Sequence, residues 1–433
     1  MDTSPIFTQD TIAFGILMLT LGFVFYTSTS ENSIWKKFYK YIPALLMAYM
    51  LPAVFTTAGL IAPEWESVNE AGEVSKHSTQ LYYVASRFLL PAALVLMTLS
   101  IDLKAIFNLG PKALIMFLTG TIGIIIGGPV AILLISTVSP ETVGGAGPDA
   151  VWRGLATLAG SWIGGGANQA AMLEIYEFNP KNYGGMVLVD IVVANIWMAL
   201  LLLGIGKSEK IDNWLKADTS AIETLKEKVS SYTAKNSRIP TLADFIVILS
   251  LAFVVVGIAH FGADVIALFL KENFKAVSDK SSAMSSFGSQ FFWMISIATL
   301  LGIFLSFSKF KKYEGAGASK IGSIFIYILV ATIGMKMDLT KIVDNPGLIA
   351  VGLVWMAIHV VILIAVAKFI KAPYFFLAIG SQANVGGAAS APVVAAAFHP
   401  SLATVGVLLA VFGYVIGTYG AMLTAELMRF VAT

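Results

Sequence analysis

The stretch AGSWIGGGANQAA (residues 159–171) decides the fold, and IGSQANVGGAASA (residues 379–391) repeats its pattern in the second half of the chain. Each stretch lies inside an apolar segment, at 150–177 and 372–398, where a lipid-facing helix would carry Leu or Ile. Glycine weakens a helix by about 1 kcal/mol relative to alanine, and Pro392 removes a further amide donor. We therefore expect both segments to be interrupted helices.

The rest of the composition is that of an integral membrane protein. Of the 433 residues, 57% are hydrophobic and 12% are charged, whereas a soluble domain carries about 25% charged residues. The mean hydropathy is +0.81, so the lipid bilayer must be part of the solvent. The net charge of +2 gives no field that would attract nucleic acid. The absence of cysteine excludes disulfides and thiolate metal sites.

Ten apolar runs meet the length of about 20 residues that a helical span needs. They lie at 10–29, 41–61, 80–101, 112–137 and 183–205, and at 242–270, 290–308, 320–337, 346–367 and 401–425. Residues 1–10 lack Lys and Arg, so the first run is expected to be a retained span and no cleaved signal peptide. A polar linker at 206–240 separates the two sets, and a short amphipathic helix is expected in it around Trp214.

The two halves of the chain carry matching motifs in the same order. These are Asp102-Leu103 and Asp338-Leu339 at span ends, Gly160-Ser161 and Gly380-Ser381 in the interrupted segments, and Phe178-Asn179-Pro180 and Phe398-His399-Pro400 after them. The partners lie 236, 220 and 220 residues apart. We therefore expect two transmembrane repeats, 1–205 and 241–433, joined by a cytoplasmic linker at 206–240.

The distribution of Lys and Arg predicts the orientation of the repeats, because these residues mark the cytoplasmic side. Basic residues cluster at 36–40, 104–112 and 309–312, and the linker is weakly basic, whereas the loop at 62–79 is acidic. These assignments agree if each interrupted segment is re-entrant, so that each half has about five crossings and the halves are inverted. The N-terminus then lies outside. If both segments cross fully, the halves are parallel and the linker falls outside; we favour inversion.

Broken backbone at membrane depth is tolerated only inside protein or beside a hydrated cavity, and paired broken segments indicate a transporter's binding site. Half-helix N-termini suit an anionic ligand, while amide, hydroxyl and carbonyl oxygens suit Na⁺. The alternative is that the glycines only allow close helix packing. The expected substrate-binding residues in these segments are Ser161, Gly165, Gly166, Asn168, Gln169, Ser381, Gln382, Asn384, Gly386, Gly387 and Ser390.

Ionisable residues within spans are costly and usually face a cavity or a partner. Asp190 is the expected coupling residue, as a ligand of Na⁺ or a proton carrier, with Asn168, Asn384 and Glu174 beside it; alternatively it is an interfacial aspartate. Arg87 is expected either to bind a substrate carboxylate or to reach the outer surface. Glu174 is also expected as a partner of Arg87 or Arg153. No cofactor is expected, and no metal other than Na⁺ as a coupling ion.

No enzyme motif is present. The chain lacks a Walker-type phosphate loop and a His-Glu-x-x-His zinc motif, and Gly160-Ser161 has no evident base nearby. We therefore expect neither an enzyme nor a nucleotide-driven pump.

The motifs at 160–168 and 380–387 resemble those of the YjcL-like family of uncharacterised integral membrane proteins, and the resemblance covers essentially the whole chain. That family is similar to a branch of the cation:proton antiporter and anion transporter superfamily. The resemblance implies inverted repeats, a mobile core domain that holds the interrupted elements, and a panel domain that often forms a homodimer. It implies no substrate. Neither interrupted region is followed by the paired Asp-Asp of the proton antiporters, which favours a symporter.

The function expected is cation-coupled transport of a small anionic organic solute across a bacterial cytoplasmic membrane by alternating access. A second reading is a cation/proton antiporter without an organic substrate, in which Asp190 carries the proton. A third is a non-transporting receptor or enzyme subunit that retains the fold.

Overall fold

The computed structural model describes residues 4–39, 42, 44–68, 74–99, 106–220, 222, 239–278, 287–341, 344–399 and 402–432. Several residues used above therefore lie outside the described part of the chain, namely Lys40, Asp102, Leu103, Lys104, Pro400 and most of the linker, 223–238.

Within the described residues, the first half contains six long helical elements, α1, α3, α4–α5, α7, α9 and α10, and one short strand pair. In chain order its elements are α1 (Asp10–Ser28), α2 (Ser33–Tyr39), α3 (Ala44–Thr57), β1 (Glu64–Val68), β2 (Val74–Ser78), α4 (Leu81–Val84), the π-helical turn η1 (Ala85–Leu89), α5 (Leu90–Leu99), α7 (Pro111–Ser136), α8 (Pro140–Val143), η2 (Gly147–Asp149), α9 (Val151–Ile175), η3 (Pro180–Asn182) and α10 (Tyr183–Ile205). The strands pair antiparallel, with Glu64 opposite Ser78. This strand pair lies within the acidic loop at 62–79, for which no strand is predicted from the sequence.

The second half follows the same order of long elements. It consists of α11 (Ser208–Leu215), α13 (Leu242–Asn273), α14 (Lys275–Ser278), α15 (Gln290–Ser306), η5 (Lys309–Ala316), α16 (Ala318–Lys336), η6 (Leu339–Lys341), α17 (Gly347–Phe369), α18 (Tyr374–Val385), α19 (Gly387–Phe398) and α20 (Ala403–Ala432). The expected linker helix is confirmed as α11, with Leu215 buried and Trp214 54% exposed.

Within the described residues, eight helices are long and apolar enough to cross a membrane. Two bent pairs, α2 with α3 and α15 with η5, raise the number to ten if each pair is one span. These ten correspond to the ten apolar runs, so the chain is a predominantly α-helical polytopic membrane protein, as predicted.

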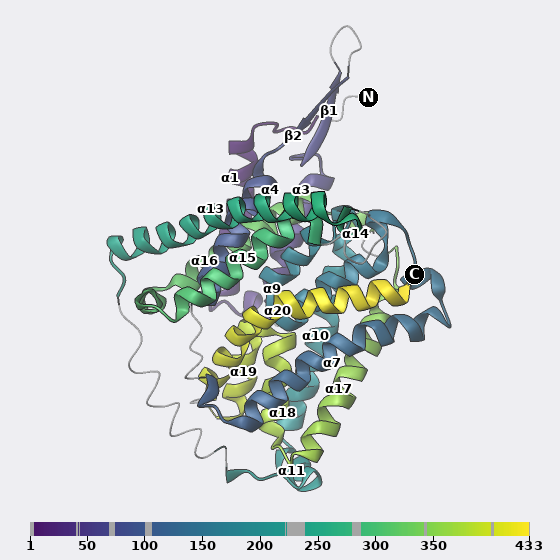
Figure 1. The fold of residues 1–433 in the computed structure, drawn as a ribbon, viewed down its shortest axis with the longest axis vertical. Helices are drawn as coiled ribbons and strands as arrows, with labels where there is room; N and C mark the ends of the chain where they lie inside the picture. Colours follow the sequence, from purple (N-terminus) through teal and green to yellow (C-terminus); the bar gives the residue numbers. More distant parts are fainter. Residues whose placement is uncertain are drawn as a thin grey trace.

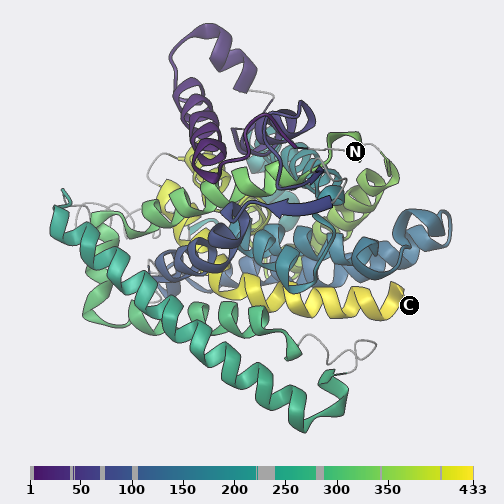
Figure 2. The same ribbon diagram turned by 90° about the horizontal axis from the view of Figure 1, so that it is seen from above.

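The long helices pack into two groups, which Figures 1 and 2 show from two directions. We call α7, α9, α10, α17, α18, α19 and α20 the hairpin group, because it holds both interrupted segments; α20 packs along α9, while α17 and α18 pack on α7. The flanking group comprises α1, α3, α4–α5, α13, α15 and α16, in which α15 and α16 pack on α5 and α16 also packs on α3. Figure 2 shows α1 and α13 on opposite sides of the molecule.

Glycines let helices approach closely inside each group. In the hairpin group, a Cβ on Gly417 of α20 would lie 2.4 Å from the Cα of Gly164, and one on Gly380 of α18 would lie 2.7 Å from the backbone of Met116. In the flanking group, a Cβ on Gly334 of α16 would lie 2.3 Å from the carbonyl oxygen of Tyr49. Each group is therefore densely packed within itself, as small residues allow in membrane proteins.

Candidate functional site

The first interrupted segment, α9, is a helical hairpin. Gly165 has φ 73° and ψ −173°, a backbone conformation that is essentially restricted to glycine. The rings of Trp152 and Tyr176, near the two ends of α9, lie only 5.5 Å apart, whereas an unbroken helix would separate them by about 36 Å. The Arg153 guanidinium also donates to the carbonyl of Tyr176. The chain therefore turns back at Gly165, and we call the joined ends of α9 the first base.

The second interrupted segment, α18 and α19, has the same form. Its chain turns at Gly386 and at Gly387, which has φ 56°. Gln382 Nε2 donates to Ser390 Oγ across the turn at 2.6 Å, and the rings of Phe375 and Phe398 lie 5.2 Å apart at the opposite end. We call these joined ends the second base.

The two bases lie at opposite ends of α7. The first base adjoins the C-terminal end, because Val151 N, at the start of α9, donates to the carbonyl of Gly144, just after α8, at 3.0 Å. The second base adjoins the N-terminal end, because Lys112 Nζ donates to the carbonyl of Lys371 at 3.3 Å.

The linker helix is also attached to the second base. Asp212 of α11 accepts a hydrogen bond from the amide of Tyr374 at 2.6 Å, and Figure 1 shows α11 beside α18 at the lower end of the molecule. Burial raises the pKa of Asp212, and the Tyr374 amide opposes that shift. The linker and the second base therefore share one end of the molecule.

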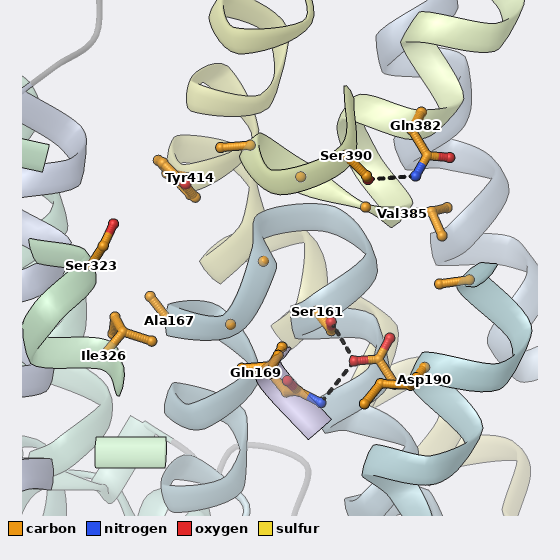
Figure 3. A pocket seen from close by; sticks show the side chains of 18 of the residues that line it. Ser161, Ala167, Gln169, Asp190, Ser323, Ile326, Gln382, Val385, Ser390 and Tyr414 are labelled. Carbon is orange, nitrogen blue, oxygen red and sulfur yellow. Dashed lines mark hydrogen bonds between the residues drawn. The ribbon is translucent and has the colours of Figure 1, made fainter. Parts of the chain in front are cut away.

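The tips of both hairpins line one cavity of about 430 Å³ between the two groups (Figure 3). Nine predicted site residues line it: Ser161, Gly165, Gly166, Gln169, Asp190, Gln382, Gly386, Gly387 and Ser390. The structure thus brings together, around one space, residues that are up to 229 positions apart in the chain.

Asp190 of α10 is the acidic group of this cavity, and it is 6% exposed. Its Oδ2 accepts hydrogen bonds from Ser161 Oγ at 2.7 Å and Gln169 Nε2 at 3.1 Å, and its Oδ1 accepts one from Trp162 Nε1 at 2.7 Å. Three neutral donors stabilise a carboxylate without cancelling its charge. Because no Lys, Arg or His is among the described lining residues, Asp190 can hold a cation or a proton there.

Asn168 and Asn384, which were expected to bind substrate and ion, do not line the cavity. Asn168 donates to the carbonyl of Gly164 at 2.8 Å and accepts from Thr418. Asn384 donates to the carbonyls of Gly380 and Phe117 at 2.8 and 2.9 Å, and accepts from Thr121 at 2.8 Å. Each amide therefore attaches its hairpin to a neighbouring helix, α20 or α7.

Ser381 is also placed away from the cavity, in a buried chain of hydrogen bonds. Trp197 Nε1 donates to Ser381 Oγ at 2.7 Å, and Ser381 Oγ lies 2.8 Å from His359 Nε2. His359 Nδ1 lies 3.0 Å from the carbonyl of Gly120. Because a carbonyl only accepts, Nδ1 carries the proton and Nε2 accepts from the serine hydroxyl. Every group is satisfied, so none is left for a solute.

Arg87 and Glu174 lie outside the cavity lining and form an ion pair with each other, as one of the sequence readings expected. The hydroxyl of Tyr82 donates to the same carboxylate. The Arg87 guanidinium also lies 4.5 Å from the ring centroid of Phe291. Both charges are thus already partnered inside the protein.

Other helices bring to the cavity hydroxyl groups that were not predicted from the sequence. Ser323 and Tyr327 of α16 and Tyr414 of α20 line it. Ser323 and Tyr327 are four residues apart in a predominantly apolar span, a spacing that places two polar groups on one helix face. That spacing is the sequence signal that could have found them.

The comparisons with known proteins agree with this membrane architecture. Residues 15–431 match the family described as "Protein of unknown function (DUF819)". A curated relative, "Uncharacterized membrane protein YjcL" of Bacillus subtilis (strain 168), is 24% identical over 371 residues, which cover 84% of this chain and 85% of that protein. Because the family model spans almost the entire sequence, this chain belongs to the DUF819 family of membrane proteins of unknown function.

Proposed function

We propose that the chain is a secondary active transporter that moves a small anionic organic solute across the bacterial cytoplasmic membrane, coupled to Na⁺ or H⁺. The observation that carries this proposal is the meeting of two helical hairpin tips at one cavity that contains a buried carboxylate. The volume of about 430 Å³ suits a small solute, since ligand cavities measure about 300–1,000 Å³.

The charges of the cavity supply a reason for coupling. The second arm of each hairpin begins at its tip, so its free amide groups and helix dipole favour an anionic group there. Asp190 opposes this, because two like charges ~6 Å apart repel by roughly 3 kcal/mol at an effective dielectric constant of about 20. A cation or proton on Asp190 removes the repulsion. The solute therefore binds well only together with the coupling ion.

The packing supports alternating access through a movement of one group against the other. Close glycine contacts hold each group together, while the cavity lies on the boundary between the groups. The first base lies at the C-terminal end of α7 and the second base at its N-terminal end, which supports inverted halves. The basic residues predict that the end of the molecule with the second base lies on the cytoplasmic side, which agrees with this placement.

A cation/proton antiporter without an organic solute is the second candidate. It is favoured by the absence of Lys, Arg and His from the described lining residues, because an anionic solute is often bound by such a side chain. In this case Asp190 carries Na⁺ and H⁺ in turn.

Reconstitution into proteoliposomes tests both candidates. Symport predicts uptake of a solute from a metabolite panel that depends on a Na⁺ or H⁺ gradient, whereas exchange predicts a change of internal pH on addition of Na⁺ alone. Asp190→Asn keeps the shape of the side chain and removes its charge, so we expect it to abolish ion dependence in either case. Asp338→Asn is the matched control, because Asp338 lies outside the cavity lining, in a separate depression. Ion dependence that survives in Asp190→Asn contradicts the assignment of Asp190.

A further inference from the structure

The cavity extends toward the end of the molecule that holds the second base. Thr56 and Thr57, near the C-terminal end of α3, line the same surface depression as Asn179 and Lys181 beside the first base. The N-terminal end of α3 therefore lies toward the second base. The cavity is lined by Leu45 in the first turn of α3, by Met97 at the end of α5 and by Ser323 near the start of α16. It also reaches Asn195 on the second half of α10, a residue that is exposed.

On the side of the first base, an aromatic contact crosses from one group to the other. Tyr49 of α3 lies one turn beyond Leu45, and its ring centroid is 6.0 Å from that of Tyr183 of α10. Both side chains are buried, with exposed fractions of 1% and 0%. Because α3 belongs to the flanking group and α10 to the hairpin group, this pair is a buried contact across the boundary, on the first-base side of the cavity.

The Arg87–Glu174 ion pair crosses the same boundary. Glu174 lies on the second arm of α9, close to the first base. Arg87 lies in the π-helical turn η1 of the flanking group, and its backbone carbonyl accepts from His260 of α13 at 2.9 Å if His260 Nε2 carries the proton. Single π-helical turns often mark functional positions. The side chains of Arg87 and Glu174 are only 31% and 12% exposed, so the pair is a partly buried contact that a displacement of the groups would break.

We propose that Tyr49, Tyr183, Tyr82, Arg87 and Glu174 form a gate that closes the cavity from the side of the first base. The structure is then the state open toward the second base, which the lysine pattern places in the cytoplasm. The inference rests on the proposed function in one respect only: it takes the cavity to be reached from both sides in turn. Arg87 and Glu174 thereby act as gating residues, because their charges attract each other across the boundary between the groups and do not bind a solute.

The natural absence of cysteine allows a direct test that needs no solute. Ala388→Cys places one thiol at the second hairpin tip, on the cavity lining. The probe is a membrane-impermeant methanethiosulfonate reagent, added to sealed right-side-out and inside-out vesicles. With the gate intact, we expect labelling from the side of the second base to exceed labelling from the other side. Adding Glu174→Gln weakens the closed gate and is expected to increase labelling from the side of the first base by about tenfold.

Two further variants make the result specific. Arg87→Lys keeps the charge of the pair and is expected to preserve the sidedness. Lys112→Gln breaks an ion pair with Asp218 at the opposite end of the molecule and is the matched control, expected to leave the labelling unchanged. The gate is refuted if Glu174→Gln, eluting as a single folded species, labels with the sidedness of the parent. Failure of solute uptake alone contradicts the proposed function and leaves the gate standing, because the labelling assay reports accessibility only.

Discussion

At the scale of single residues, the two halves place the same serine in different surroundings. Ser161 and Ser381 occupy matching positions 220 residues apart. Ser161 donates to Asp190 at the cavity, whereas the position 220 residues after Asp190 is Ala410. Without that carboxylate, Ser381 is bound instead by Trp197 and His359. Of these two matching serines, therefore, Ser161 hydrogen-bonds a carboxylate and Ser381 does not.

Replacing each serine by alanine should separate binding from stability. In Ser161→Ala, Asp190 loses a donor but still faces the cavity, so we expect a weaker Na⁺-induced rise of the melting temperature than in the parent protein. In Ser381→Ala, the buried Trp197 N–H and His359 Nε2 lose their partner, at a cost of about 1–3 kcal/mol. We expect that variant to melt at a lower temperature with an unchanged Na⁺ effect. Equal behaviour of the two variants in thermal unfolding, with and without Na⁺, would contradict this division.

The sequence located the stretches of the site better than the side chains that face it. Glycine-interrupted segments are visible as a pattern, because they break an apolar run. Which amides face a cavity depends on neighbours from other helices: Thr418 and Thr121 engage Asn168 and Asn384, and neither threonine can be assigned to its partner from spacing alone. For the same reason the hydroxyl of Tyr414 was missed.

At the scale of elements, the position of each interrupted segment in the chain was easier to predict than the reversal of the chain within it. Gly164-Gly165-Gly166 predicted a break in α9, and the structure places it at Gly165. A break is compatible with a bent crossing or with a complete reversal. The contact of Trp152 with Tyr176 distinguishes the two, and it joins residues whose proximity has no local sequence signal.

The packing of α20 against the first hairpin is the element contact that we expect to be most sensitive to added volume. In Gly417→Ala, the new Cβ would lie 2.4 Å from the Cα of Gly164, and backbone cannot move aside as a flexible side chain can. Overpacking of this kind costs about 1–3 kcal/mol, so we expect a lower melting temperature in detergent.

Gly257→Ala in α13 is the control for this substitution. A Cβ at Gly257 meets nothing within 4 Å, and alanine favours a helix over glycine by about 1 kcal/mol. We therefore expect its melting temperature to equal or exceed that of the parent. If Gly417→Ala were as stable as Gly257→Ala, the close approach of α20 to α9 would be wrong.

At the scale of the whole molecule, the cavity belongs to neither half and to neither helix group alone. The hairpin tips and α10 provide one wall, while α3, α5 and α16 provide the other. The hydrophobic runs predicted these flanking helices as spans. Their hydrophobicity could not predict which of them face the hairpins, because lipid tails are as apolar as the side chains of a neighbouring helix.

The orientation of the two halves is the last prediction, and it can be read from the two hairpin bases. Glu177 and His399 are exposed residues that follow the first and second hairpins, respectively. If the halves are inverted, Glu177→Cys reacts with an impermeant thiol reagent added to the outside of cells, and His399→Cys reacts only in inside-out vesicles. Ser67→Cys in β1 and Ser308→Cys before η5 calibrate the outer and inner faces that the loop charges predict. Reaction of Glu177→Cys and His399→Cys from the same side would establish parallel halves. In that case the two hairpins could not approach the cavity from opposite membrane faces, and the alternating exposure proposed for Asp190 would lose its structural basis.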